Sequence, residues 1–234
     1  MIEQLVFELA RPEPPSFANF LPGANSEALD ALIRIANGSV PETGLLVWGA
    51  AGAGKTHLLR ATIGACVARG QRAVLVAAPG ALLAADPHVL AAAPLVAVDD
   101  ADRAGDDAQG RLFTLYNALR ASGGRLLVAS RMPPSRMTLR EDLRTRLGWG
   151  LVYEIAPLAD AEKPAALAAY ARQRGFGLSD EVVRYLLAHG RRDMTTLLST
   201  LAALDHHSLA TKRAVTVPLL RAWLQREIRL DDAG

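Results

Sequence analysis

The chain has 234 residues, half of them hydrophobic, and its 26 basic and 24 acidic side chains leave a formal net charge of +2. The length suits one domain with a smaller appendage, and so small a charge gives no ground by itself for expecting a nucleic-acid-binding protein. A single cysteine, Cys66, excludes an internal disulfide and fits a reducing cytoplasm, and we expect no signal sequence and no membrane span.

The chain begins with an alternating apolar run, MIEQLVFEL, which a proline-rich stretch separates from the rest. Leu5 and Phe7 fall on one face of an extended strand, whereas Gln4 falls on the other. The prolines remove backbone donors and keep the chain extended. We therefore expect residues 1–14 to form a tail presented to a partner. Pairing as an edge strand, or with the tail of a second copy, is the alternative.

Short apolar runs then alternate with helical patterns as far as Pro157. The expected strands are 44–48, 72–77, 94–99, 125–130 and 151–155, and the expected helices are 54–69, 81–92 with a break near Pro87, 108–121 and 139–146. Strands buried on both faces and separated by helices are typical of a layered α/β fold with a parallel sheet. This pattern predicts an α/β domain over residues 15–157.

After Pro157 the pattern is helical throughout. The expected helices are 160–174, 179–189, 192–208 and 218–229, with Asp160, Ser179 and Thr216 as candidate N-cap residues. We therefore expect a small helical domain over residues 158–234.

The strongest chemical signal is the octapeptide GAAGAGKT, which follows an apolar strand and opens a helical pattern. Its glycines, Gly49, Gly52 and Gly54, allow backbone amides to surround phosphate oxygens. Lys55 is expected to reach the β and γ phosphates, and Thr56 to hold Mg²⁺ through its hydroxyl. The octapeptide predicts a nucleotide site, with a glycine-rich turn that binds nothing as the alternative.

Polar residues near the ends of other elements extend this site. The run LVAVDD ends in Asp99, expected to orient Mg²⁺, and Asp100, placed to polarise an attacking water. Ser130 ends the apolar run RLLVAS, where it could sense the γ phosphate or serve only as a turn residue. His57 either contacts the nucleotide or caps the first helical turn.

The segment LREDLRTRLGWG places Arg140, Arg144 and Arg146 at near-helical spacing before the last strand. An arginine here could project to the edge of the domain and meet a nucleotide held by a neighbouring subunit. A solvated basic helix is the alternative, and spacing alone favours it.

Several segments resemble AAA+ proteins related to the bacterial replication initiator DnaA. SFANFLPGAN, GKTHLL and TRLGWGL are similar to the AAA+ domain of DnaA, whereas LFTLYNALRASGGRLLVASRMPP, LGWGLVYEIAPLAD and RQRGFGLSDEVVRYLL resemble the Hda group of DnaA-related regulatory inactivators. The likeness runs from about residue 15 to the C-terminus. It implies an AAA+ P-loop NTPase fold, with a parallel five-stranded sheet followed by a small all-helical lid domain.

The resemblance assigns roles to individual positions. It makes Asp99 and Asp100 the Mg²⁺ motif, Ser130 the first sensor, and Arg146 an arginine finger that acts on nucleotide in the adjacent protomer. Such a finger neutralises charge that develops on the transferring phosphoryl group. The residues that match the stretch beside the adenine are Phe17, Asn19, Phe20 and Gly23. ADP or ATP with Mg²⁺ is the implied ligand.

The chain also departs from the initiator pattern. DnaA carries a helix-turn-helix domain after its lid and a longer insertion between its second and third strands, so we expect no sequence-specific DNA binding here. Thr195 stands where the family places its second sensor arginine, and Arg191 or Arg192 would have to substitute. We therefore expect weak ATP hydrolysis by the chain itself, or a preference for ADP.

The family implies partners for the tail. Hda proteins carry an N-terminal peptide that binds the DNA polymerase sliding clamp, its beta subunit, and QLVFEL is similar to it, with Val6 as a departure. In such a peptide Gln4 would hydrogen-bond at a pocket rim, while Leu5 and Phe7 enter an apolar groove. The proline tether lowers the entropy lost on binding.

The implied function is that of a nucleotide-bound adaptor. It would sit on the DNA-loaded clamp and present Arg146 to ATP held by DnaA, which prevents over-initiation. The protein would be cytoplasmic and would reach the nucleoid and the replisome through the clamp. Three alternatives stay open: an autonomous AAA+ ATPase such as a helicase loader or truncated initiator, an interaction module whose nucleotide is only structural, and a homodimer formed through the tail.

Overall fold

The computed structural model describes residues 14–191, 193–211 and 214–231, and the chain divides into two compact units with the boundary after Pro157. The predictions for Gln4, Leu5, Phe7 and Arg192 lie outside the described residues, as does the side chain of Thr195. Among the residues described, no helix combines the length and the hydropathy needed to cross a membrane.

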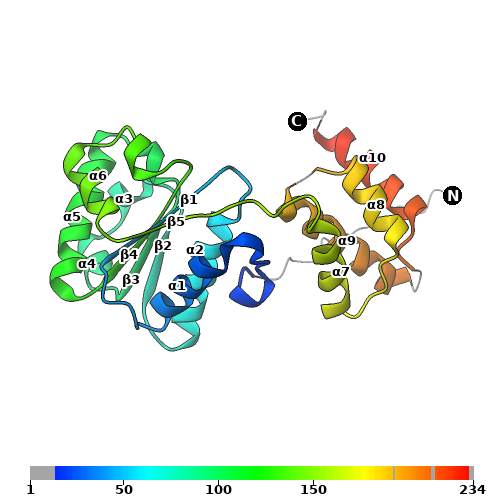
Figure 1. The fold of residues 1–234 in the computed structure, drawn as a ribbon, viewed down its shortest axis with the longest axis horizontal. Helices are drawn as coiled ribbons and strands as arrows, with labels where there is room; N and C mark the ends of the chain where they lie inside the picture. Colours follow the sequence, from blue (N-terminus) through cyan, green and yellow to red (C-terminus); the bar gives the residue numbers. More distant parts are fainter. Residues whose placement is uncertain (1–13, 192, 212–213, 232–234) are drawn as a thin grey trace. The chain divides into compact units, whose positions relative to one another are not determined.

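The first unit contains a parallel sheet with helices on both faces (Figure 1). Its strands are β1 Gly44–Trp48, β2 Ala73–Val76, β3 Leu95–Val98, β4 Arg125–Ser130 and β5 Leu151–Glu154, in the spatial order β2-β3-β4-β1-β5. All four pairings are parallel, which confirms the predicted five-stranded sheet. Because β4 lies between β1 and β3, the segments that follow these three strands meet at one edge of the sheet.

Alternate residues along β1, β2, β3 and β4 pack against different helices. One face is covered by α1 Ser26–Ala36 and α2 Lys55–Ala68, and the other by α3 Ala81–Ala84, α4 Pro87–Ala91, α5 Asp106–Ser122 and α6 Glu141–Gly148. On β1, Leu45 and Val47 face α1 and α2, whereas Leu46 faces α5 and α6. Short 3-10 helices η1 Phe17–Asn19, η2 Gly23–Asn25, η3 Ala101–Arg103 and η4 Pro134–Arg136 connect these elements.

Helix α1 was not among the expected helices, although its sequence carries the signal. Ala28, Leu32 and Ile35 recur at helical spacing, and all three are buried against the sheet. The expected break near Pro87 is confirmed, because Asp86 accepts a hydrogen bond from the His88 amide and α4 begins at the proline. Cys66 is a buried core residue of α2.

The second unit is a helical bundle. Its helices are α7 Lys163–Gln173, α8 Asp180–His189, α9 Met194–Thr211 and α10 Val217–Asp231. Leucine and valine side chains from all four helices form one core, including Leu167, Leu186, Leu201 and Leu220. This arrangement confirms the predicted helical lid.

Two of the predicted caps of this bundle have different outcomes. Ser179 accepts a hydrogen bond from the Val182 amide at 3.4 Å, which confirms it as the cap of α8. Asp160 was wrong as a cap, because α7 begins three residues later at Lys163. Its carboxylate instead forms an ion pair with the Lys163 Nζ at 2.6 Å.

Candidate nucleotide-binding site

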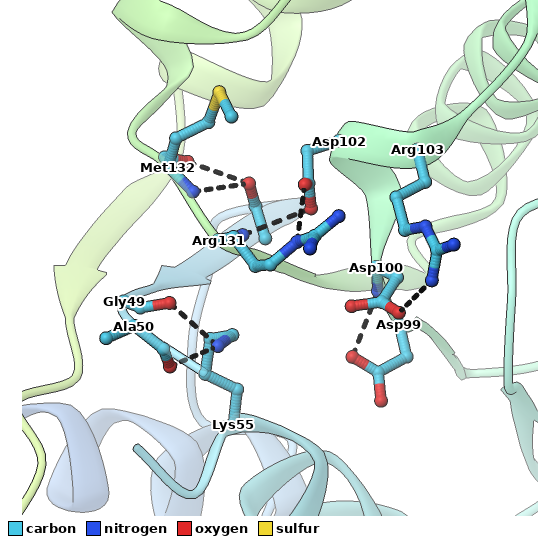
Figure 2. Close-up of polar contacts among 10 residues, drawn as sticks. Gly49, Ala50, Lys55, Asp99, Asp100, Asp102, Arg103, Arg131 and Met132 are labelled. Atoms are coloured by element: carbon cyan, nitrogen blue, oxygen red, sulfur yellow. Dashed lines mark hydrogen bonds and ion pairs between the residues drawn. The ribbon is translucent and has the colours of Figure 1, made fainter. Parts of the chain in front are cut away.

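The backbone of the loop between β1 and α2 binds the side chain of Lys55. Lys55 is 7% exposed, and its Nζ donates to the carbonyl oxygens of Gly49 at 2.8 Å and Ala50 at 2.9 Å (Figure 2). Burial lowers the pKa of Lys55, and nearby carboxylates, first among them Asp99, oppose that shift. The ammonium is therefore fixed by backbone oxygens at the place where phosphate oxygens would bind.

Two glycines of this loop leave no room for a side chain. A Cβ at Gly49 would lie 2.2 Å from the carbonyl oxygen of Ile155, the residue after β5. Gly54 has a φ of 99°, in the left-handed region, and a Cβ there would lie 2.8 Å from the ring of Phe20. The loop conformation thus depends on glycine at both positions.

Thr56 and Asp99 form the oxygen pair expected of an Mg²⁺ site. The Thr56 Oγ1 donates to the Asp99 Oδ2 at 2.6 Å, although the two residues are 43 positions apart. Mg²⁺ is usually held by one or two carboxylates together with phosphate oxygens and water. A hydroxyl and a carboxylate at the mouth of a phosphate loop fit that pattern. Among the described residues, no group of three or more His, Cys, Asp or Glu side chains is placed to hold a metal ion by itself.

Asp100 adopts a left-handed backbone conformation with φ 52°, which is uncommon for a residue other than glycine. Its amide donates to the Asp99 Oδ1 at 3.0 Å, and its own carboxylate lies 3.6 Å from the Arg103 guanidinium. The side chain is 39% exposed, so water reaches it. Its role in polarising an attacking water stays a prediction.

Ser130 is fully buried and bonds only within its turn. Its Oγ donates to the Met132 carbonyl oxygen at 2.8 Å and accepts from the Met132 amide at 3.1 Å. This bonding matches the alternative of a simple turn residue. The sensor role stays a prediction.

Arg131 and Asp102 lie at the same edge of the sheet, and sequence reasoning missed both. The Arg131 amide donates to the Asp102 Oδ1, and its Nε donates to the Oδ2, each at 3.1 Å. The Asp102 carboxylate is 3% exposed, whereas the arginine side chain is 50% exposed. Figure 2 shows the guanidinium between Lys55 and the acidic residues that follow β3. The sequence signal that could have identified Arg131 is its place directly after Ser130, a predicted sensor position.

The segment around Phe17 and Phe20, which the sequence predicts to lie beside the adenine, packs against the start of α2. Ser16 and Asn19 form a reciprocal capping box, in which the Ser16 amide donates to the Asn19 Oδ1 at 2.8 Å. The His57 Nε2 lies 2.9 Å from the Ser16 carbonyl oxygen, and its ring centre is 5.6 Å from that of Phe20. Phe17 and Phe20 both pack against the hydrophobic cluster that α1 and α2 form with the sheet.

Burial lowers the pKa of His57, so the neutral ring donates from its Nε2 to Ser16. Sequence reasoning offered a nucleotide contact or a helix cap for this histidine. The structure shows a third role, because the imidazole ties the segment that contains Phe20 to the helix after the phosphate loop.

Arg146 is fixed on a different surface, between α6 and α5. Its Nε donates to the Asn117 Oδ1 at 3.0 Å, and its guanidinium carbon lies 4.1 Å from the centre of the Phe113 ring. Trp149 follows, with its ring 5.9 Å from the same guanidinium and 62% of the residue exposed. Within the described part of the chain, the hydrogen bonds and ring contacts of Arg146 involve α5, α6 and Trp149, and none involves Lys55 or Asp99.

Comparison with known proteins shows which folds and which family model the chain resembles. The family model described as the Hda lid domain matches residues 160–224. Domain III of the replication initiation protein DnaA from Thermotoga maritima is 20% identical with a TM-score of 0.74, over 91% of this chain and 95% of that one. AMPPCP-bound DnaA from Aquifex aeolicus is 21% identical with a TM-score of 0.70, over 81% of this chain and 64% of that one.

A crystallised DNA replication initiation factor is also similar, with 21% identity and a TM-score of 0.69 over 85% of this chain and 67% of that one. At these identities the solved structures establish the fold alone, and the match to the Hda lid domain is confined to residues 160–224. The chain therefore shares the fold of DnaA domain III, and its residues 160–224 resemble the Hda lid domain.

Proposed function

We propose that this protein is a nucleotide-bound AAA+ adaptor that inserts Arg146 into the ATP site of a DnaA-type initiator and so stimulates hydrolysis of the initiator's ATP. The observation that carries the proposal is the fixation of Arg146 by Asn117 and Phe113, away from the chain's own Lys55. An arginine held in one orientation stabilises developing phosphoryl charge with little reorganisation.

The chain's own nucleotide site supports the adaptor role. The solved DnaA from Aquifex aeolicus is bound to AMPPCP, and the chain shares its fold. Backbone amides of the loop would bind ADP or ATP phosphates, while Thr56 and Asp99 would hold Mg²⁺, which neutralises phosphate charge when bound. Lys55 would exchange its carbonyl partners for phosphate oxygens.

The geometry of Arg146 leaves part of its guanidinium for a partner. The Nε is taken by Asn117, and the Nη1 donates to the Asp142 carbonyl oxygen at 3.3 Å. Among the described residues, no acceptor bonds the Nη2. The exposed Trp149 beside it offers the kind of aromatic side chain that anchors protein interfaces.

Residues 1–14 supply the second part of the proposal. Their sequence, with Gln4, Leu5 and Phe7, supports binding to the sliding clamp. A protein held on the DNA-loaded clamp meets the initiator on DNA without reading base sequence. Cytoplasmic location and recruitment to the replisome follow from this part of the proposal.

A reconstitution tests both parts together. Clamp loaded on DNA, initiator charged with radiolabelled ATP and this protein are mixed, and phosphate release is measured. We expect fast release only when all three are present. Arg146→Ala should lower stimulated release by about 1,000-fold and leave clamp binding unchanged, whereas Arg144→Ala on the same helix should retain stimulation. Full stimulation by the Arg146→Ala variant would overturn the role of Arg146 as an arginine finger.

An autonomous AAA+ ATPase is the second candidate, and the bonded Thr56–Asp99 pair favours it. Steady ATP turnover by the isolated chain, unaffected by Arg146→Ala in dilute solution, would select this candidate over the adaptor. Binding to a replicative helicase would point to a helicase loader.

A further inference from the structure

We propose that Arg131, held by Asp102, contacts the γ phosphate of a bound nucleoside triphosphate and takes over the sensing position that sequence reasoning gives to Ser130. This inference rests on the proposed nucleotide binding, and it names the group that distinguishes a triphosphate from a diphosphate.

The position of Arg131 follows from the order of the strands. β4 pairs with β1 on one side and β3 on the other, and the Gly49 amide donates to the Ser130 carbonyl oxygen at 3.2 Å. The residue after Ser130 therefore lies between the phosphate loop and the acidic pair that follows β3. Figure 2 shows the guanidinium in this space, between Lys55 and Asp100.

Ser130 itself is poorly suited to this task. Its hydroxyl is buried and already donates to one backbone group of Met132 while it accepts from another. A short side chain so engaged would have to break its turn to reach a phosphate. The same turn leads the chain into Arg131, whose long side chain is half exposed.

Asp102 orients this arginine. Its carboxylate is almost fully buried, and it accepts from both the Arg131 amide and the Nε. A buried carboxylate is costly unless it is bonded in this way. With the Nε fixed, the two Nη groups form the outer edge of the guanidinium, and among the described residues neither has a partner. Such an edge suits bidentate binding of phosphate oxygens.

The charge of the site also favours a second cation. Lys55 lies near the carboxylates of Asp99, Asp100 and Asp102, and the guanidinium of Arg131 occupies the space between the lysine and Asp100 (Figure 2). A triphosphate adds negative charge to this acidic edge.

The test compares triphosphate with diphosphate. Dissociation constants of AMPPCP and ADP, both with Mg²⁺, are measured by calorimetry for the unaltered protein and for Arg131→Ala. We expect AMPPCP binding to weaken by about 10- to 100-fold, the range for a lost bond to a charged group, and ADP binding to change by less than about threefold. An equal effect on both nucleotides, or none, overturns the inference.

Two further variants separate contact from folding. Arg136→Ala removes the same charge from the exposed η4 nearby and should leave both constants unchanged. Asp102→Asn should weaken AMPPCP binding selectively, because the arginine loses its orienting charge. If Arg131→Ala is unfolded by circular dichroism, Arg131→Gln, which keeps a donor for Asp102, replaces it under the same criterion.

The outcome for the unaltered protein distinguishes this inference from the proposed function. Failure to bind either nucleotide would overturn both. Binding of ADP without AMPPCP, or binding of both with an unchanged ratio in Arg131→Ala, would overturn the role of Arg131 and leave the proposed adaptor intact.

Discussion

Two regions of the first unit hold the cations on which the proposed function rests, and the surroundings of these cations differ. At the edge of the sheet, Lys55 bonds its own loop and Thr56 bonds Asp99, so this site is assembled from within the chain. On α6, Arg146 is equally well fixed, but Trp149 beside it is largely exposed. In the proposed function, the first region binds a small ligand of its own, whereas the second meets a partner.

The largest effect expected on the chain's own nucleotide binding comes from removing the cation of the first region. Lys55→Met should weaken ADP and AMPPCP binding by about 100-fold or more, because the loop loses its charged bonds to phosphate. Isothermal calorimetry measures this change. Arg60→Ala, exposed on the same helix, should bind as the unaltered protein does. Equal affinity in both variants would show that the loop binds no phosphate through Lys55.

The next effect tests how firmly the first region is assembled. The Asn25 amide is 5% exposed, donates to the Ala156 carbonyl oxygen at 2.9 Å and accepts from the Ala156 amide at 2.8 Å. Asn25→Ala should lower the free energy of unfolding by about 2 kcal/mol, since it leaves buried backbone groups unpaired. Urea unfolding measures this loss. A loss no larger than that of the exposed Asn37→Ala would contradict the role of the pair.

A smaller effect concerns the second region. Asn117→Ala removes the acceptor of the Arg146 Nε, so stimulated hydrolysis of initiator ATP should fall by about tenfold, near the value of one hydrogen bond. Asn117→Asp keeps an acceptor and should restore most of the activity. Thr114→Ala, exposed on the same helix, serves as control. Altered nucleotide affinity in Asn117→Ala would mean that the two regions are not independent.

The smallest expected effect depends on pH. Burial lowers the pKa of His57 below the 6.5 of the unfolded chain, so the unfolded state binds the extra proton first. Stability should therefore fall as the pH drops below about 6.5. Urea unfolding at pH 7.5 and 5.5 measures this loss of stability. In His57→Gln the loss between the two pH values should be smaller, by less than about 1 kcal/mol. The control is His189→Gln in the second unit. If His57→Gln loses as much stability as the unaltered protein between the two pH values, His57 does not cause the pH dependence.

Local patterns predicted most of the fold. The five strands were found because each is a short, mostly apolar run, largely buried in β1, β3 and β4 and only partly buried in the edge strands β2 and β5. The phosphate loop was found because its glycines and Lys55 occur at fixed spacing after β1. Helix α1 was missed despite regular apolar spacing. The cap at Asp160 was wrong because a short polar side chain near a helix start can bond a neighbouring lysine instead of an amide.

The parts of the site that the sequence did not predict depend on contacts between residues far apart in the chain. Arg131 meets Asp102 across 29 positions, and Asn25 meets Ala156 across 131. Spacing along one segment carries no information about such pairs, because they arise only when the strands take their order in the sheet. The bonding of Ser130 was equally hidden, since a serine hydroxyl at a strand end can face either a ligand or its own turn.

Trp149 also makes the proposed interface accessible to spectroscopy. The chain has three tryptophans, and this one combines high exposure with a place beside Arg146. In a variant with Trp48→Phe and Trp223→Phe, emission would come from this indole alone, and a partner that covers it would shift the spectrum to shorter wavelength. Docking could then be timed in a stopped-flow instrument without an attached dye, and separated from the chemical step that follows it.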